Sequence, residues 1–237
     1  MNFKIGFSTG ALYKYFTVKE SLNFLQKSEY RVVELNFINI ENIKKGLLDE
    51  ITKGDIENFE YVSLHAPVFP YGRTKDTEFI FDKIQKLNKI RELDIVIFHP
   101  NTVQDFNVFK NTPFPVAFEN MDCRKKYFKI PEEIISVLSD EKFKIILDVN
   151  HVYTNDNTMR LASYFYEKLG NKIVQTHLSG YEDHHDALYK TKQNIIIKSI
   201  QNPLCPIIIE SVISPDETEK EMDYIIKQLS RFNKCKN

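Results

Sequence analysis

The chain contains little cysteine and no long run of apolar residues. Its three cysteines, Cys123, Cys205 and Cys235, lie far apart and form no CxxC pair, which argues against a disulfide framework and against a zinc site made of thiolates. No segment approaches the roughly 18 consecutive apolar residues of a transmembrane helix, and the N-terminal residues are typical of a strand rather than of a signal peptide. We therefore expect a cytoplasmic protein that binds no membrane.

The chain also lacks an excess of charge of either sign. It has 32 Lys and Arg against 33 Asp and Glu, so its net charge is −1 at pH 7. A protein without a general basic field binds a polyanion only through a local patch or through metal ions. The composition therefore weakens the case for DNA as a partner without excluding it.

Segments typical of a second domain are missing as well. There is no low-complexity segment, no linker rich in Gly or Pro, and no repeat longer than a strand and a helix. The length of 237 residues suits one α/β barrel, and 42% of the residues are hydrophobic, which is enough for a packed core. We expect residues 1–237 to form a single domain.

What the sequence does contain is a regular alternation of two patterns. Apolar runs rich in Val, Ile and Phe recur roughly every 25 to 30 residues, and a segment with helical periodicity follows each of them. This order is typical of parallel βαβ units, and eight units predict a (β/α)8 TIM barrel. The expected strands are Phe3–Ser8, Arg31–Phe37, Tyr61–Ala66, Ile95–His99, Pro115–Asn120, Phe143–Val149, Ile173–Leu178 and Pro206–Ser211.

Helical segments are predicted between these strands. Several begin with capping signals, such as the Thr17-x-x-Glu20 capping box. The fourth crossover, residues 103–113, offers no more than one or two helical turns, so we expect a thin barrel wall there. The expected helices are Thr17–Ser28, Glu41–Thr52, Thr74–Arg91, Pro131–Ser139, Thr158–Leu169, Ala187–Ile200 and Pro215–Phe232.

Polar residues occur at the C-terminal ends of six expected strands. In a (β/α)8 barrel these ends meet at one mouth, where active sites are built. All six histidines of the chain lie at such ends or just beyond them. The residues are His65, His99, Glu119, Asp148 with His151, His177 and Glu210, and the loop after the seventh strand adds Asp183, His184, His185 and Asp186.

These side chains predict a site for several metal ions. Zinc and manganese prefer imidazole and carboxylate ligands, and carboxylates crowded into a buried mouth repel one another without cations. A single histidine there is more often a satisfied polar residue, and a buried carboxylate can pair with Lys or Arg. No Lys or Arg occupies another strand end, however. Glu34, on the second strand, could reach the mouth, but we favour a structural role for it.

The motifs that carry these residues resemble those of the xylose isomerase-like barrels, and within them the endonuclease IV branch. The similarity runs from the third strand to the C-terminus. The matching elements are an HPG-like His99-Pro100-Asn101, the EN pair Glu119-Asn120, the DxxH motif from Asp148 to His151, the HL pair His177-Leu178, the DxH motif Asp183-His184-His185, and the E[ST] pair Glu210-Ser211.

This resemblance implies a trinuclear zinc site with nine protein ligands. One zinc would take His65, His99 and Glu119. A second would share Glu119 and add Asp148, His177 and Glu210, and a third would take His151, Asp183 and His185. His184 is the alternative to His185. Manganese is the alternative to zinc.

The implied activity is hydrolysis of a phosphoester, as in an endonuclease IV-like phosphodiesterase, with Glu119 and Glu210 as catalytic residues. Endonuclease IV has longer loops after its first two strands, which weakens DNA as the substrate and leaves a small phosphorylated compound as the other candidate. Candidate substrate contacts are Phe69, Tyr71, Arg73, Asn120 and His184.

Two alternatives stay open. A sugar or sugar-phosphate isomerase or epimerase, the other large activity of these barrels, would use Glu119, Asp148, His177 and Glu210 around one metal ion, with the two glutamates moving a proton beside the substrate carbonyl. His151 would then hold a substrate hydroxyl, and His65, His99, Asp183 and His185 would have no role. A barrel that binds a metal or metabolite without turnover is the third possibility.

Overall fold

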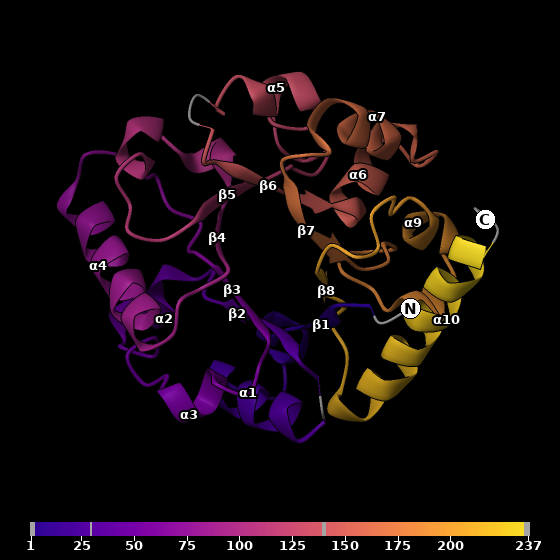
Figure 1. Cartoon of the computed structure of the whole chain (residues 1–237), viewed down its shortest axis with the longest axis horizontal. Coiled ribbons are helices and arrows are strands. Elements are labelled where there is room, and N and C mark those ends of the chain that lie inside the picture. The colour runs from indigo at the N-terminus through magenta and orange to yellow at the C-terminus, as the bar shows by residue number, and fades with distance from the viewer. Residues whose placement is uncertain (1–2, 29, 139–140, 235–237) are drawn as a thin grey trace.

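Eight parallel strands close into a barrel in the computed structural model, which describes residues 3–28, 30–138 and 141–234. Each strand pairs with the next one along the chain, and β8 pairs with β1. Figure 1 shows the strands as a central ring with the helices outside it. The predicted (β/α)8 fold is therefore confirmed. The strands are β1 (Ile5–Ser8), β2 (Val32–Asn36), β3 (Tyr61–His65), β4 (Ile95–Phe98), β5 (Val116–Glu119), β6 (Lys144–Asp148), β7 (Ile173–Leu178) and β8 (Ile207–Ile209).

Each strand divides its side chains between two cores, because successive residues point to opposite faces. On β4, Val96 and Phe98 pack in the large core between the barrel and its helices. Ile95 and Ile97 instead pack inside the barrel with side chains of β5 and β6. The inward alternation ends in polar residues at the C-terminal end of the strands, which is how the sequence delivers them to the mouth.

Most of the predicted helices are present with shifted bounds, whereas the helices Lys53–Ile56 and Val149–Asn155 were not predicted. The second begins at Val149, the residue expected to end the sixth strand. Thr17 caps α1 through the predicted capping box with Glu20. The helices are α1 (Val18–Lys27), α2 (Ile40–Lys44), α3 (Lys53–Ile56), α4 (Lys75–Ile90), α5 (Pro131–Ile135), α6 (Val149–Asn155), α7 (Arg160–Leu169), α8 (Leu188–Thr191), α9 (Asn194–Lys198) and α10 (Thr218–Lys234), with 3-10 turns η1 (Thr9–Leu12), η2 (Pro100–Thr102), η3 (Phe106–Phe109) and η4 (Pro215–Glu217). Ser139, the predicted end of the helix that begins at Pro131, lies outside the described residues.

Two predicted helices are wrong in their continuity. In place of one helix over residues 41–52, the chain has α2 up to Lys44 and then turns, and α3 begins only at Lys53. Gly46, in these turns, adopts a φ of +82° that glycine tolerates best. In place of one helix over residues 187–200, α8 ends where Lys192 takes a φ of +58°. A left-handed residue interrupts the helical hydrogen-bond ladder, and periodicity alone does not reveal it.

The fourth crossover is as thin as the sequence predicts, and aromatic side chains fill the wall. It contains only the 3-10 turns η2 and η3. Phe98 of β4 lies 4.7 Å from Phe109 of η3 between ring centroids, and Tyr71 lies 5.0 Å from Phe98. These edge-to-face contacts bury large rings where other crossovers bury a helix.

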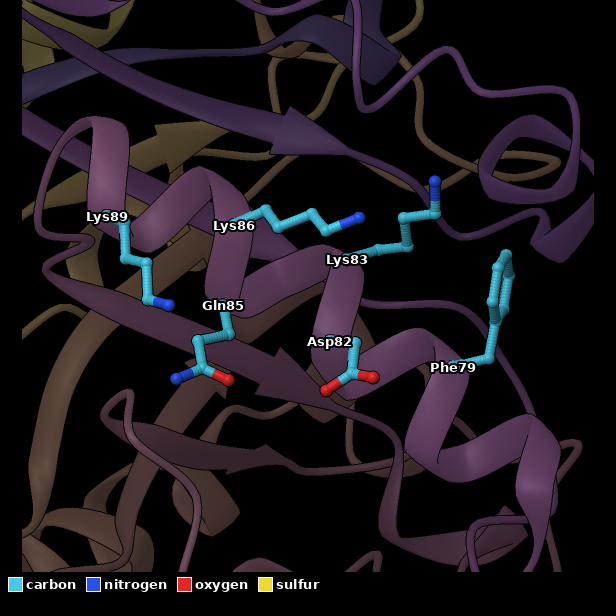
Figure 2. A pocket seen from close by; sticks show the side chains of 6 residues that line it. All are labelled: Phe79, Asp82, Lys83, Gln85, Lys86 and Lys89. Atoms are coloured by element: carbon cyan, nitrogen blue, oxygen red, sulfur yellow. The ribbon is translucent and has the colours of Figure 1, made fainter.

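A shallow hollow on the outer face of α4 is separate from the mouth. It has a volume of about 380 Å³ and is lined by one helix. Figure 2 shows its side chains pointing in different directions rather than toward a common point. Such a surface offers no convergent polar groups, so we place the functional site elsewhere. Within the described residues, none of the helices is long and apolar enough to span a bilayer.

Candidate metal centre

The barrel brings the polar strand ends together at its C-terminal mouth. His65, Glu119 and Asp148 are the last residues of β3, β5 and β6. His177 lies within β7, and His99 and Glu210 directly follow β4 and β8. Glu119 is 1% exposed and His177 is fully buried. Residues that are up to 145 positions apart in the sequence therefore face one another.

Three of these residues form a first group on one side of the mouth. Glu119 Oε2 lies 3.3 Å from His65 Nε2 and 2.9 Å from His99 Nε2. One ligand atom from each of the three residues fits within 4.8 Å of the others. Two imidazoles and a carboxylate at this spacing are the donor set of a zinc site with open positions.

The second group shares Glu119 with the first. His177 Nδ1 lies 2.7 Å from Glu119 Oε1 and 3.5 Å from Glu210 Oε2. Glu119, Asp148, His177 and Glu210 each offer a ligand atom within 4.8 Å of the other three. The two oxygens of Glu119 thus face different groups, which is the arrangement of a carboxylate that bridges two cations.

Asp148 provides an independent test of whether cations fit. Its side chain is fully buried, and its Oδ1 accepts hydrogen bonds from the backbone N–H groups of Asn150 and His151. Its Oδ2 is buried without a hydrogen-bond partner among the described residues, although it lies 3.3 Å from His151 Nδ1. A buried carboxylate oxygen without a hydrogen bond is costly, and a cation at this position relieves the cost.

The pKa of Glu210 points the same way. Burial, together with the negative charges of Glu34, Asp148 and Glu119, raises this pKa to about 8, although His177 opposes the shift. The charged form of Glu210 is therefore unfavourable in the protein alone. Because a divalent cation stabilises the charged form of its ligands, the crowded carboxylates fit a metal site.

The histidines balance part of this negative charge. Burial lowers the pKa of His65, but the hydrogen bond and charge of Glu119 outweigh burial and raise it to about 9. The pKa of His177 is raised well above its usual value, since Glu210, Glu34 and Glu119 outweigh burial. Imidazolium groups thus take the place of cations in the protein alone, and zinc would displace their protons.

The residues of the implied third zinc are not gathered as closely. The His151 and His185 rings lie 6.1 Å apart between centroids. His185 Nδ1 hydrogen-bonds Ser179 Oγ at 2.9 Å and lies 3.9 Å from Glu210. Asp183 is exposed in the loop after β7, and its backbone N–H donates to Asp186. Among the described residues, this trio does not form a group comparable with the other two.

His184 and His185 face different surroundings. His185 lies beside Glu210, whereas the exposed His184 has its Nδ1 3.4 Å from the Arg124 guanidinium. Of the two neighbouring histidines, His185 is therefore the one on the metal side. Arg124 also pairs with the buried Asp122 at 2.9 Å, a contact that no motif in the sequence predicts.

Among the candidate substrate contacts, the aromatic ones lie away from the metal groups. Tyr71 is fully buried in the aromatic cluster of the fourth crossover, and its hydroxyl donates to the carbonyl of Pro67. Phe69 packs on Tyr71. Arg73 is exposed and pairs with Asp105 at 2.9 Å. Their positions favour packing and surface roles over contact with a ligand at the metal centre.

Asn120 joins the ends of two strands. Its amide donates to the Asp148 carbonyl at 3.0 Å, and its side-chain oxygen accepts the Asp148 N–H at 2.7 Å. Its own carbonyl lies 2.8 Å from His151 Nδ1. Asn120 therefore fixes the relative positions of two candidate ligands.

A cavity of about 560 Å³ opens beside the metal groups, over β1 and β2. The sequence did not reveal it, because its lining combines the ends of β1 and β2, parts of α1 and α2, and the turns between them. It combines amide and hydroxyl groups with apolar walls, and none of its lining residues is Lys or Arg. It is lined by Ser8, Thr9, Gly10, Tyr13, Phe16, Thr17, Val18, Asn36, Ile38, Asn39, Asn42, Leu47, His185, Glu210 and Val212.

Glu34, for which the sequence favours a structural role, also contacts one of the candidate ligands. It is fully buried in the barrel interior, and its Oε2 lies 2.9 Å from His177 Nε2. It therefore lies directly beneath the metal groups. The sequence did not predict its contact with a histidine 143 positions further along the chain.

Comparison with known proteins rests on structure alone, since no protein-family model and no curated protein matches this chain. A D-tagatose 3-epimerase-like protein is 14% identical with a TM-score of 0.70, over 99% of this chain and 100% of that one. Endonuclease IV from Thermus thermophilus is 14% identical with a TM-score of 0.67, over 96% of this chain and 99% of that one.

An IolI protein, solved with a bound zinc atom, is 13% identical with a TM-score of 0.68, over 97% of this chain and 99% of that one. At these identities the likeness concerns the fold. The likeness shows a shared barrel fold, and because the similar structures include a xylose isomerase domain containing protein, the predicted resemblance is confirmed at the level of the fold. Both an endonuclease and epimerases have this fold, so the fold does not distinguish between their reactions.

Proposed function

We propose that the chain is a metal-dependent hydrolase of phosphoester bonds that works with two divalent cations, zinc first and manganese as the substitute. The observation that carries the proposal is the sharing of Glu119 between two groups of ligand atoms. An enzyme with one metal ion needs only the second group. His65 and His99 would be redundant in it, yet both lie against Glu119.

The residues present fit the cations by donor type and spacing. His65, His99 and Glu119 would hold one ion, and Glu119, Asp148, His177 and Glu210 would hold the other. When bound, paired cations lower the pKa of a water molecule toward neutrality and neutralise phosphoryl oxygens. A third ion, on His151, His185 and Asp183, stays a prediction that needs movement of the loop after β7.

The protein side chains supply orientation. Glu119 fixes the spacing of the two groups because both of its oxygens are engaged. Glu210 belongs to the second group and also lines the neighbouring cavity, so its carboxylate borders both cation and substrate. We propose that these two glutamates orient the attacking water, while the cavity binds an uncharged part of the substrate.

The experiment uses protein stripped with a chelator and reloaded with zinc or manganese. We expect about two bound ions per chain, and turnover of a chromogenic phosphodiester or of a duplex with an abasic site. Glu119→Gln should lose the activity, whereas Arg73→Ala, which changes an exposed residue away from the metal groups, should retain it. Absence of turnover on both substrates in the reloaded protein would count against the proposal.

A sugar isomerase or epimerase is the second candidate, and the cavity over β1 and β2 favours it. Amide and hydroxyl groups with apolar walls and no Lys or Arg suit an uncharged polyhydroxy compound. Glu119 and Glu210 would then exchange a proton with the carbon beside a carbonyl. Metal stoichiometry separates the candidates, since one ion per chain favours the isomerase and two favour the hydrolase.

A further inference from the structure

We infer that Glu34 is a positioning residue for the metal centre: it holds the His177 imidazole so that Nδ1 faces the cations. The inference rests on the proposed metal binding but not on which reaction follows. Glu34 lies on β2, and His177 lies on β7 across the barrel. Both side chains are fully buried.

The two nitrogens of His177 face opposite ways. Nδ1 lies 2.7 Å from Glu119 and 3.5 Å from Glu210, among the ligand atoms of the second group. Nε2 lies 2.9 Å from Glu34 Oε2. A nitrogen that binds a cation must be free of its proton, so the proton of the ring has to reside on Nε2.

Glu34 is the acceptor for that proton. The other polar atom near Nε2 is the amide nitrogen of Gln175, at 2.8 Å. It can donate to Nε2 when that nitrogen carries no proton, but it cannot accept the proton that Nε2 carries when Nδ1 binds a cation. Among the described residues, the contacts of Nε2 therefore leave only the Glu34 carboxylate to accept its N–H. A carboxylate in this position fixes the tautomer and the ring orientation, and it raises the basicity of the metal-binding nitrogen.

Further hydrogen bonds hold the carboxylate in turn. Ser63 Oγ donates to Glu34 Oε2 at 3.2 Å, and Gln175 Nε2 donates to the same oxygen at 2.8 Å. None of the ion pairs among the described residues joins Glu34 to a Lys or Arg. The negative charge of Glu34 therefore acts on His177 rather than on a structural cation.

A purely structural role would not require a carboxylate here. The interior of a (β/α)8 barrel is ordinarily packed with branched apolar residues, and Ile97, Ala117 and Ile146 pack in this way on β4, β5 and β6. A buried carboxylate is costly unless its charge is compensated, and an apolar residue of similar volume is often the more stable choice. The geometry of His177 explains what the carboxylate adds.

The test measures zinc affinity by competition with a chelator in Glu34→Leu, Glu34→Gln and, as the control, Ile97→Ala. Glu34→Leu should weaken zinc binding at the second group by about 10- to 100-fold, the usual effect of losing such a partner. Glu34→Gln should recover most of the affinity, because its amide oxygen still accepts the Nε2–H. Ile97→Ala truncates a side chain of the barrel interior that packs with Ala117 and Ile146, so it should leave the zinc affinity of the folded protein unchanged.

A second measurement follows the ring itself. In zinc-loaded protein labelled with ¹⁵N, we expect His177 to show a protonated Nε2 that exchanges slowly, and in Glu34→Leu this proton should exchange fast. Equal zinc affinity in folded Glu34→Leu and in the unchanged protein would overturn the inference, as would binding of zinc through Nε2. If Glu34→Leu does not fold, the ¹⁵N measurement on the unchanged zinc-loaded protein decides, and an Nε2 of His177 that carries no proton overturns the inference. Neither readout depends on turnover, so a failure of this inference can be distinguished from a failure of the proposed hydrolase reaction.

Discussion

The candidate ligands rest on two different kinds of residue in the barrel interior. On each strand, the side chain two positions before the ligand points the same way and lies beneath it. Beneath His65 and His177 these residues are polar, Ser63 and Gln175, and Glu34 hydrogen-bonds both. Beneath the other four ligands they are apolar: His99 follows Ile97, Glu119 follows Ala117, Asp148 follows Ile146, and Glu210 follows Ile208.

The difference separates two ways of holding a ligand. Above the apolar residues, side-chain direction depends on packing and on contacts among the ligands themselves, such as His99 with Glu119 at 2.9 Å. Above the polar residues, hydrogen bonds from below add a second constraint. We expect substitutions of the apolar residues beneath the ligands to lower the stability of the protein, and substitutions of the polar residues to lower its metal affinity.

We expect the largest effect at Glu119. It contacts His65 and His177, which lie above polar residues, and also His99, which lies above an apolar one. Glu119→Gln removes the shared carboxylate, so both groups should lose their cation. The hydrolase activity should fall by roughly three orders of magnitude or more, the rate equivalent of several kcal/mol of transition-state stabilisation. Elemental analysis and steady-state rates on the proposed substrates check this. Retention of two ions per chain would show that the groups do not depend on a common ligand.

Ile97→Ala tests the role of the apolar residues beneath the ligands. Ile97 is fully buried inside the barrel, so its truncation should lower the free energy of unfolding by about 2–4 kcal/mol. Zinc affinity should stay unchanged once the protein is folded, in contrast to Glu34→Leu. Denaturant unfolding and chelator competition measure the two quantities. A loss of zinc affinity as large as that of Glu34→Leu would erase the proposed distinction.

The metal-free protein should lose stability as pH rises. The pKa of Glu210 is raised to about 8 by burial and neighbouring carboxylates, and that of His65 is raised to about 9 by Glu119 despite burial. In the unfolded chain these values are about 4.3 and 6.5. A raised pKa contributes stability that is complete below the unfolded value and is lost as pH rises through the folded value.

The consequence is a gap between two melting curves. From pH 7 to pH 9 the Tm of metal-free protein should fall, while zinc-loaded protein, in which the cations replace these protons, should change less. Calorimetry of both forms at pH 7, 8 and 9 measures the gap. A gap that narrows with pH would mean that protons do not compete with the cations at these side chains.

The sequence predicted the strand-end residues well for a physical reason. Buried strands alternate with helices in a fixed order, and a polar residue that ends an apolar run can point only into the mouth. His65, Glu119 and Asp148 were placed in this way, and the structure has each of them at the end of its strand. Their role as ligands stays a prediction that metal analysis has to test.

Other positions depend on information that periodicity does not carry. Glu34 looked structural because its partner, His177, is set by the closure of the barrel. Tyr71 looked available for a ligand because it lies in a loop, but the thin fourth crossover takes its ring into the core. The cavity over β1 and β2 combines residues of strands, helices and turns that only the folded barrel brings together.

Asp183 is where the smallest effect is expected. It is exposed in a loop without a regular hydrogen-bond ladder, while both metal groups are built on strands. Asp183→Asn should therefore leave two zinc ions per chain and change their affinity little. If this variant instead loses one of three ions, the loop must close to bring Asp183 beside His151 and His185. Asp183 would then be a third kind of ligand, which lies above no residue of the barrel interior and which only the bound cation holds in place.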